Sequence, residues 1–144
     1  MDNYKIIECI SSKEVQETYP VMKQLHTHLA DNYVELVAYM QKHKGYKLFR
    51  CVDDQGSLVA LVSYTIEMRL SANGKLMYLE DLVIDEQYRG QGLGTKLLDF
   101  ACEHTKQAGC TALTLDCGIQ RLESHEFYKK RGLKNDGLNF KINL

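Results

Sequence analysis

A glycine-rich segment contains the residues of this chain that most directly suggest chemistry. Residues 89–95 read Arg-Gly-Gln-Gly-Leu-Gly-Thr and stand between a hydrophobic stretch and a long amphipathic one. Alternate glycines let backbone N–H groups turn inward, and the helix start that follows adds unpaired donors and the positive end of a dipole. Such a loop binds phosphate or pyrophosphate. The residues expected to hold the ligand are Arg89, Gly90, Gln91, Gly92, Leu93, Gly94 and Thr95.

The spacing within this segment distinguishes between classes of phosphate ligand. A nucleotide-hydrolysing P-loop has Lys and then Ser or Thr directly after its last glycine, whereas here Gly94 is followed by Thr95 and Lys96. A dinucleotide-binding fingerprint requires Gly-x-Gly-x-x-Gly, and neither Gly90 nor Gly92 begins that pattern. The pattern that fits is Arg-x-x-Gly-x-Gly, preceded by a hydrophobic strand and an acidic turn.

A second motif follows at residues 127–133, which read Phe-Tyr-Lys-Lys-Arg-Gly-Leu. The two motifs, in this order and spacing, resemble the GNAT superfamily of N-acetyltransferases. Residues 113–128 and 140–144 also resemble the aminoalkylphosphonate N-acetyltransferase branch. The resemblance implies an enzyme that uses acetyl-CoA as cosubstrate. Its acceptor would be a primary amine of a small molecule or peptide, which attacks the thioester directly in a ternary complex.

The resemblance also implies roles for residues near both motifs. Tyr128 matches the position that protonates the departing thiolate. Arg121 stands where many members carry an asparagine that contacts the pantetheine arm, and this departure puts the direct carry-over of that contact in doubt. Arg121 is a candidate donor contact, with an ion pair to Asp116 or substrate binding as alternatives. His125, one helical turn before Tyr128, is a candidate for proton movement or donor contact. The pantetheine arm would lie along the backbone of three strand residues, one of whose N–H groups polarises the acetyl carbonyl: Leu82, Val83 and Ile84.

The residue that removes the proton from the acceptor ammonium stays open at this stage. Glu80 and Asp81 are neighbours in the strand before the glycine-rich segment, and strict alternation would place them on opposite faces. Both could instead be solvated or paired with a cation, and Glu67 or a chain of water molecules could serve as the base. The residues expected to line the acceptor pocket are Tyr33, Tyr64, Glu67 and Asp116.

Two histidines and five cysteines are of residue types that could bind a metal. His26 and His28 form a His-x-His pair, but residues two apart on a helix face different directions. We expect them at the surface or in the acceptor site, near a junction between helices, and we expect no metal. The five cysteines form no Cys-x-x-Cys pair and have no metal-like spacing to histidine, so we expect reduced thiols.

The remaining patterns predict a single α+β domain over residues 1–144. Hydrophobic periods and turn residues indicate, in chain order, a strand at 4–10, two helices joined near 27–31 with Pro20 interrupting the first, strands at 48–52, 58–70 and 76–84, a helix at 92–108, a strand at 112–116, a helix at 122–130 and a closing hairpin at 133 and 138–144. A strand, a helix and a strand in succession form a parallel crossover. We expect a mixed, mostly antiparallel sheet with one parallel β-α-β crossover and helices on both faces.

Composition narrows the range of partners. The chain has 144 residues and a net charge of −1, with its charged residues well mixed, so it lacks the basic field that nucleic acids or anionic membranes attract. Its apolar runs are far shorter than a membrane span, and the first residues do not resemble a signal peptide. We expect a cytoplasmic protein with no nucleic-acid or membrane partner, and a homodimer through the edge strands of the closing hairpin.

Two other functions remain open from the sequence. One is a non-catalytic acyl-CoA-binding sensor module, which would keep the glycine-rich segment without turnover. The other is a nucleotide-binding regulatory domain. The presence of Tyr128 and of the acidic pair Glu80 and Asp81 favours an enzyme over the sensor module.

Overall fold

The structure, a computed structural model, describes residues 3–144. The chain divides into two compact units, one ending at Thr114 and the other running from Leu115 to Leu144. The strands are β1 Lys5–Glu8, β2 Lys47–Val52, β3 Leu58–Arg69, β4 Gly74–Ile84 and β5 Ala112–Leu115. The helices are α1 Ser12–Glu17, α2 Tyr19–Leu25, α3 Tyr33–His43, α4 Leu93–Gln107 and α5 Leu122–Lys130, with short 3-10 turns η1 Leu70–Ala72 and η2 Glu86–Tyr88.

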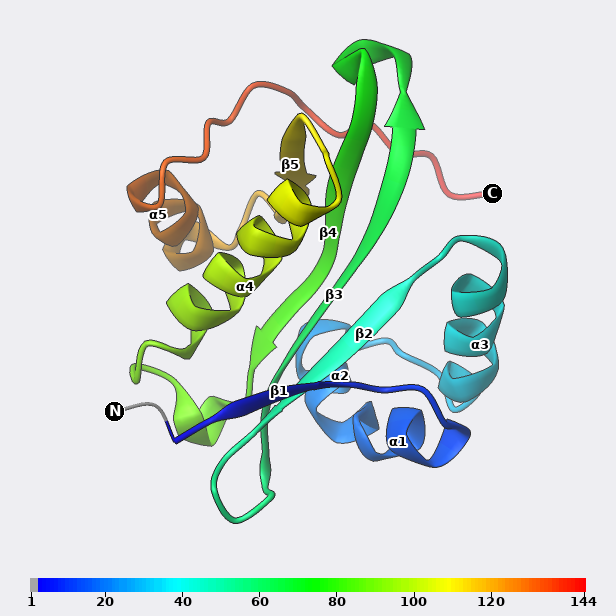
Figure 1. Cartoon of the computed structure of the whole chain (residues 1–144), viewed down its shortest axis with the longest axis vertical. Helices are drawn as coiled ribbons and strands as arrows, with labels where there is room; N and C mark the ends of the chain where they lie inside the picture. Colours follow the sequence, from blue (N-terminus) through cyan, green and yellow to red (C-terminus); the bar gives the residue numbers. More distant parts are fainter. Residues whose placement is uncertain (1–2) are drawn as a thin grey trace. The chain divides into compact units, whose positions relative to one another are not determined.

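The five strands form one sheet in the order β1-β2-β3-β4-β5. The pairs β2–β3 and β3–β4 are antiparallel, as expected for strands joined by a hairpin or a short connection. The pair β1–β2 is also antiparallel, although its connection contains α1–α3. Strand β5 lies next to β4 and is reached through α4, which is the predicted crossover. The predicted mixed sheet of an α+β fold is therefore confirmed (Figure 1).

Adjacent side chains of the sheet face different layers of helices. Leu48 of β2 belongs to a buried cluster that includes Met22 of α2 and Val37 of α3. The next residue, Phe49, points the other way, and its ring lies 4.9 Å from that of Phe100 in α4, measured between centroids. Because one face is covered by α1–α3 and the other by α4, the predicted helices on both faces are confirmed (Figure 1).

Local residues determine where the first two helices, α1 and α2, are divided. A capping box starts α1, because the Ser11 hydroxyl accepts the N–H of Glu14 at 3.1 Å and the Glu14 carboxylate accepts the N–H of Ser11 at 2.9 Å. Thr18 ends α1, and Pro20 lies in the first turn of α2, where its missing N–H leaves no helix bond unmade. The predicted interruption at Pro20 is therefore confirmed.

The predicted closing hairpin is wrong. The described residues 131–144 contain no strand, although their apolar residues alternate as in a strand. Alternation meets only the local condition for a strand, whereas a strand also needs a neighbouring edge with which to exchange hydrogen bonds. The side chains of this alternating set stay exposed instead: Leu138, Phe140, Ile142 and Leu144. A homodimer stays a prediction and loses the support of this hairpin.

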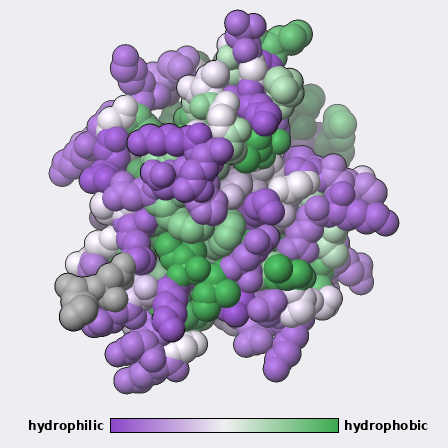
Figure 2. Space-filling model, viewed as in Figure 1, coloured by the Kyte–Doolittle hydropathy of each residue, from purple (hydrophilic) through white to green (hydrophobic). Residues whose placement is uncertain are grey.

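The face of the molecule drawn in Figure 2 is mostly polar. Figure 2 shows hydrophilic side chains over most of the visible face, with smaller hydrophobic areas between them. No helix within residues 3–144 combines the length and the apolar character that crossing a membrane requires. In the same residues, no cluster of three or more His, Cys, Asp or Glu side chains is arranged to hold a metal ion.

Replacing Glu14 by glutamine tests the start of α1. Hydrogen bonds from the backbone of Ser11 and Ile10, with a smaller contribution from Arg50, lower the pKa of Glu14 from 4.5 to about 2. A lowered folded-state pKa means that the charge stabilises the fold above pH 4.5 and that this stabilisation is lost as the pH falls towards 2. We expect Glu14→Gln to unfold at lower urea concentration than the wild type at neutral pH and at the same concentration near pH 2.

Glu17→Gln, on the exposed side of the same helix, is the matched control and should leave this pH dependence intact. Glutamine can still accept the N–H of Ser11, so the comparison isolates the charge of Glu14 from its cap. Parallel pH profiles for wild type and Glu14→Gln would contradict the assignment.

Candidate active site

Strand β4 contains a β-bulge at Glu80. Ser63 of β3 pairs with Asp81, but the next β3 residue, Tyr64, pairs with Leu79. Glu80 is therefore an extra residue in the register between these two strands. Such a bulge bends its strand and leaves one residue outside the regular ladder. The acidic residues of the candidate site thus lie where β4 is locally irregular.

The bulge brings the side chains of Glu80 and Asp81 to the same face of the sheet. The Ser63 hydroxyl donates to Asp81 at 2.6 Å, and the Thr65 hydroxyl donates to Glu80 at 3.3 Å. Ser63 and Thr65 are two residues apart on β3, so they share a face. The separation expected from strict alternation does not occur, because the extra residue shifts the alternation of β4 by one.

Asp81 is buried among donors from several elements. Its Oδ2 atom accepts hydrogen bonds from Tyr46 at 2.9 Å and from Ser63, and its Oδ1 atom lies 2.5 Å from Nε2 of His26. Burial raises the pKa of Asp81, but the bonds from His26, Ser63 and Tyr46 together outweigh burial and lower it. Asp81 is therefore held as a carboxylate and is a poor proton acceptor.

Glu80 has the opposite electrostatic environment. Partial burial raises the pKa of Glu80, and the neighbouring carboxylates of Asp81 and Glu67 add to that rise. Lys44 and the Thr65 hydroxyl oppose it without cancelling it. A carboxylate with a raised pKa accepts a proton more readily near neutral pH. When the pKa values of two adjacent carboxyl groups are shifted in opposite directions, one can act as a base while the other stays ionised.

The glycine-rich segment has the backbone that an anion-binding loop requires. Gly90 and Gly92 both have φ of 81°, in the left-handed region that favours glycine. Gly92 is also the N-cap of α4, and α4 has no side-chain cap within the described structure. The first-turn N–H groups of α4, those of Leu93, Gly94 and Thr95, are the orphan donors of a helix start.

Two contacts hold this segment in place before any ligand binds. Nε of Arg89 donates to the carbonyl oxygen of Ile84 at 3.2 Å, which keeps the guanidinium next to the end of β4. The Tyr4 hydroxyl donates to Oε1 of Gln91 at 2.9 Å, which ties the loop to the residue before β1. Arg89, Gly90, Gln91 and Gly92 are all exposed, so a ligand could reach them.

The second predicted motif lies in the unit Leu115–Leu144. Burial raises the pKa of the Tyr128 hydroxyl, Cys117 adds to that rise, and Arg121 opposes it. Nε2 of His125 lies 2.7 Å from the carbonyl oxygen of Gly118, a contact in which the ring nitrogen donates. Arg121 is the exposed N-cap of α5. The predicted donor contacts of Arg121, His125 and Tyr128 stay predictions.

The structure brings some of the predicted acceptor-pocket residues together and separates others. Tyr33 and Glu67 lie on the same side of the sheet as Glu80 and Asp81, where burial, with Asp81 as a smaller cause, raises the pKa of Tyr33 to about 12. Tyr64 lies on the other face, buried under α4 with its hydroxyl 2.6 Å from Nδ1 of His104. This placement does not favour the predicted substrate contact of Tyr64.

Asp116, the fourth predicted pocket residue, is exposed in the unit Leu115–Leu144. Glu67 forms an ion pair with Arg69 at 2.7 Å, in which the arginine neutralises part of its charge. The predicted contacts of both carboxylates with the acceptor stay predictions.

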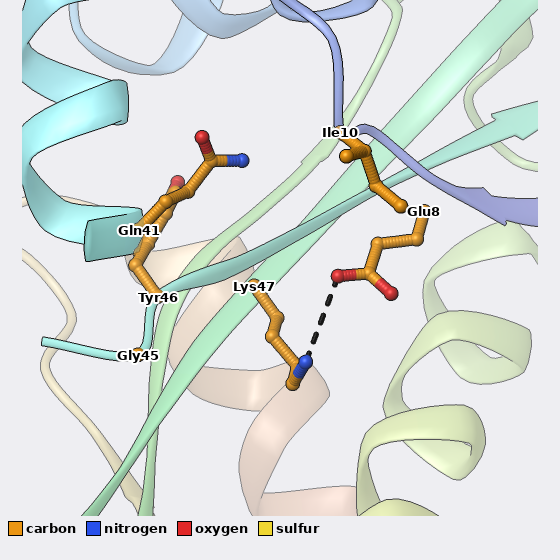
Figure 3. A pocket seen from close by; sticks show the side chains of 6 residues that line it. All are labelled: Glu8, Ile10, Gln41, Gly45, Tyr46 and Lys47. Atoms are coloured by element: carbon orange, nitrogen blue, oxygen red, sulfur yellow. Dashed lines mark ion pairs between the residues drawn. The ribbon is translucent and has the colours of Figure 1, made fainter.

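A pocket of about 300 Å³ lies beside β1, β2 and the end of α3 (Figure 3). Lys47 and Glu8 form an ion pair across it at 3.6 Å. The residues that line it include Tyr46, whose hydroxyl donates to Asp81. Neither Glu80 nor Asp81 nor any residue of the glycine-rich segment lines it. We therefore do not assign this pocket as the place where the reacting groups meet.

Sequence reasoning missed the partners of Asp81. Tyr46 and Ser63 were not singled out, and His26 was expected at the surface or in the acceptor site but not as a partner of Asp81. These residues lie 35, 18 and 55 positions from Asp81, so no local pattern connects them. The predicted hairpin could have placed Ser63 near Asp81, but the register depends on the bulge, which strict alternation does not reveal.

Three relatives of known name are similar to this chain. Glucosamine 6-phosphate N-acetyltransferase of Arabidopsis thaliana is 36% identical over 87 residues, which cover 60% of this chain and 56% of that enzyme. The enzyme of the same name from Trypanosoma brucei brucei is 31% identical over 111 residues, covering 75% and 73%. Aminoalkylphosphonate N-acetyltransferase of Salmonella typhimurium is 29% identical over 92 residues, covering 64% and 60%. The chain thus spans little more than half of the Arabidopsis relative.

A solved structure and a family model agree with these sequence similarities. The crystal structure of the Arabidopsis glucosamine-6-phosphate N-acetyltransferase superposes with a TM-score of 0.77 at 24% identity, covering 99% of both chains, which shows the shared fold. Residues 5–133 match the acetyltransferase (GNAT) family, a stretch that contains both motifs and the acidic pair of β4. The predicted resemblance is confirmed, and the chain belongs to the acetyltransferase (GNAT) family.

Proposed function

We propose that this protein is an acetyl-CoA-dependent N-acetyltransferase that acetylates a primary amine by direct attack in a ternary complex. The observation that carries the proposal is the bulged strand β4, on which Glu80 and Asp81 share a face while their pKa values shift in opposite directions. The glycine-rich segment directly after this strand supports it, since it offers the donors that a pyrophosphate needs. Family membership supports the reaction class.

On the donor side, the segment from Arg89 to Thr95 would hold the pyrophosphate of acetyl-CoA. Backbone N–H groups of the first turn of α4 and the Arg89 guanidinium supply the positive potential. The thioester arm would run along Leu82, Val83 and Ile84, the part of β4 between the bulge and the loop. An N–H group aimed at the thioester oxygen stabilises the charge that develops there during attack.

On the acceptor side, Glu80 is the proposed base. An amine attacks only in its neutral form, so the ammonium that exists near neutral pH must first lose a proton. Glu80 is suited to this because its pKa is raised, whereas hydrogen bonds keep Asp81 ionised. Asp81 then acts as a positioning residue for the groups bonded to it.

Tyr128 is the proposed proton donor to the departing thiolate. Burial raises the pKa of Tyr128, so its hydroxyl keeps its proton near neutral pH. A thiol has an ordinary pKa of about 8.5, so the transfer occurs as the thiolate forms and not at equilibrium.

A small amine that also carries a phosphate or phosphonate is the acceptor class to test first. Both relative types named above act on such amines by name, glucosamine 6-phosphate and aminoalkylphosphonates. In this chain, Lys44 lies close enough to Glu80 to influence its pKa, so a cation is available near the proposed base. A peptide amine is the alternative acceptor.

The direct experiment measures thiol release from acetyl-CoA with a panel of amines. The panel contains glucosamine 6-phosphate, glucosamine, aminoalkylphosphonates, their phosphate-free analogues and peptides with free N-termini. We expect turnover with a phosphorylated or phosphonylated amine and slower turnover with its analogue that lacks the phosphate or phosphonate. Calorimetric binding of acetyl-CoA without turnover of any acceptor would favour the non-catalytic sensor module and contradict the proposal.

Tyr128→Phe tests the proposed proton donor. The substitution removes only the hydroxyl, so acetyl-CoA binding should be unchanged while kcat falls by about a hundredfold, the usual size of an acid–base contribution. Steady-state kinetics and calorimetry measure the two quantities. Tyr39→Phe, which removes an exposed hydroxyl on α3, is the control and should keep full turnover. A kcat that Tyr128→Phe leaves unchanged would remove Tyr128 from the mechanism.

Gly92→Ala tests the pyrophosphate loop. A Cβ atom added at Gly92 would meet no other atom within 4 Å. The loss of stability in Gly92→Ala therefore comes from the left-handed φ of 81° at this residue and not from crowding. Gly109→Ala, at φ of 73° just after α4, imposes a similar backbone cost of about 1 kcal/mol away from the loop. We expect both variants to lose similar stability to urea, but only Gly92→Ala to bind acetyl-CoA more weakly. Equal acetyl-CoA affinity in the two variants would contradict the assignment of the loop.

A further inference from the structure

A contact between His26 and Asp81 joins the buried carboxylate to the protein surface. His26 is the C-cap of α2, and its Nε2 atom lies 2.5 Å from Oδ1 of Asp81. The side chain of His26 is 50% exposed, whereas that of Asp81 is 10% exposed. The backbone of His26 is also fixed, because its N–H donates to Met22 and its carbonyl accepts from Leu29. The imidazole is therefore held at the boundary between the site and solvent.

Asp81 determines how the His26 ring is protonated. An ionised carboxylate can only accept hydrogen bonds, so Nε2 of His26 must carry the hydrogen in their contact. A carboxylate in this position fixes the orientation and tautomer of an imidazole and stabilises the imidazolium when the ring takes up a second proton. Tyr46 and Ser63 hold the other oxygen of Asp81, so the carboxylate itself cannot turn away.

The proposed reaction must release a proton to solvent in every turnover. An ammonium acceptor loses two protons in becoming an amide, one before it attacks and one as the tetrahedral intermediate collapses. The departing thiolate takes up one proton to become a thiol. The remaining proton first reaches Glu80 and must then leave, or Glu80 cannot act again.

We propose that His26 carries this proton from the site to solvent, with Asp81 as the residue that positions its ring. The inference rests on the proposed function. Glu80 takes the proton from the ammonium, the neutral imidazole of His26 accepts it through water in the site, and the imidazolium releases it to bulk water. The imidazole is then neutral again, with Nε2 still bonded to Asp81.

The other ionisable groups around Asp81 are less suited to this task. Tyr33 and Tyr46 keep their protons near neutral pH, because burial raises the pKa of both hydroxyls. Asp81 is held ionised by its three donors. An imidazole can both accept and release a proton, and the ring of His26 is half exposed to solvent.

Two substitutions at His26 separate proton transfer from structural support. His26→Gln keeps an N–H donor that can reach Asp81 but has no group that titrates near neutral pH. His26→Ala removes the side chain and leaves space for added imidazole. His28→Gln and His28→Ala are the matched controls, since His28 is an exposed histidine two residues further along. Wild-type turnover with an acceptor from the panel is measured first, which tests the proposed function on its own.

We expect His26→Gln to lower kcat by about tenfold to a hundredfold with little change in the KM for acetyl-CoA. We expect added imidazole to restore part of the turnover of His26→Ala and to leave both His28 variants unaffected. Thermal unfolding of each variant identifies any loss of fold. Full turnover in His26→Gln, or a loss in His26→Ala that follows stability and does not respond to imidazole, would overturn the proposal while leaving the proposed function standing.

Discussion

The one-residue bulge in β4 is the constraint on which the candidate site depends. Without it, Glu80 and Asp81 would face opposite sides of the sheet, one towards α4 and the other towards α1–α3. With it, both carboxylates contact hydroxyl groups that are two residues apart on β3. The irregularity also comes a few residues before the glycine-rich segment. The bulge therefore places the two carboxylates on one face of the strand that leads directly into the loop before α4.

Glu80 and Asp81 lie on the same face of the sheet, but their environments shift their pKa values in opposite directions. Asp81 has three donors, and they keep it charged despite its burial. Glu80 has one weak donor at 3.3 Å and the repulsion of its neighbours. Leaving a buried carboxylate without partners costs several kcal/mol, so the donors of Asp81 are also what allows a charge to stay in the core. The fold thus separates a structural anion from a group able to take up a proton.

Local patterns predicted most of the fold, and distant pairing accounts for what they missed. The helix at 122–130 and the glycine-rich loop follow from residues close together in the sequence, and the structure has them where they were expected. The bulge and the partners of Asp81 depend on strand register and on contacts across as many as 55 residues. The prediction of a closing hairpin was wrong for a related reason, because the alternation of apolar residues in the sequence does not show whether a partner strand exists.

The most direct test of this account is a carboxyl-carbon NMR titration of Glu80 and Asp81, with Glu80→Gln and Asp81→Asn used to assign the two signals. The account predicts two separate transitions, with the pKa of Glu80 above the ordinary range of glutamate and the pKa of Asp81 below that of aspartate. Two carboxylates that titrate together at ordinary values would contradict the division of roles on which the proposed mechanism depends.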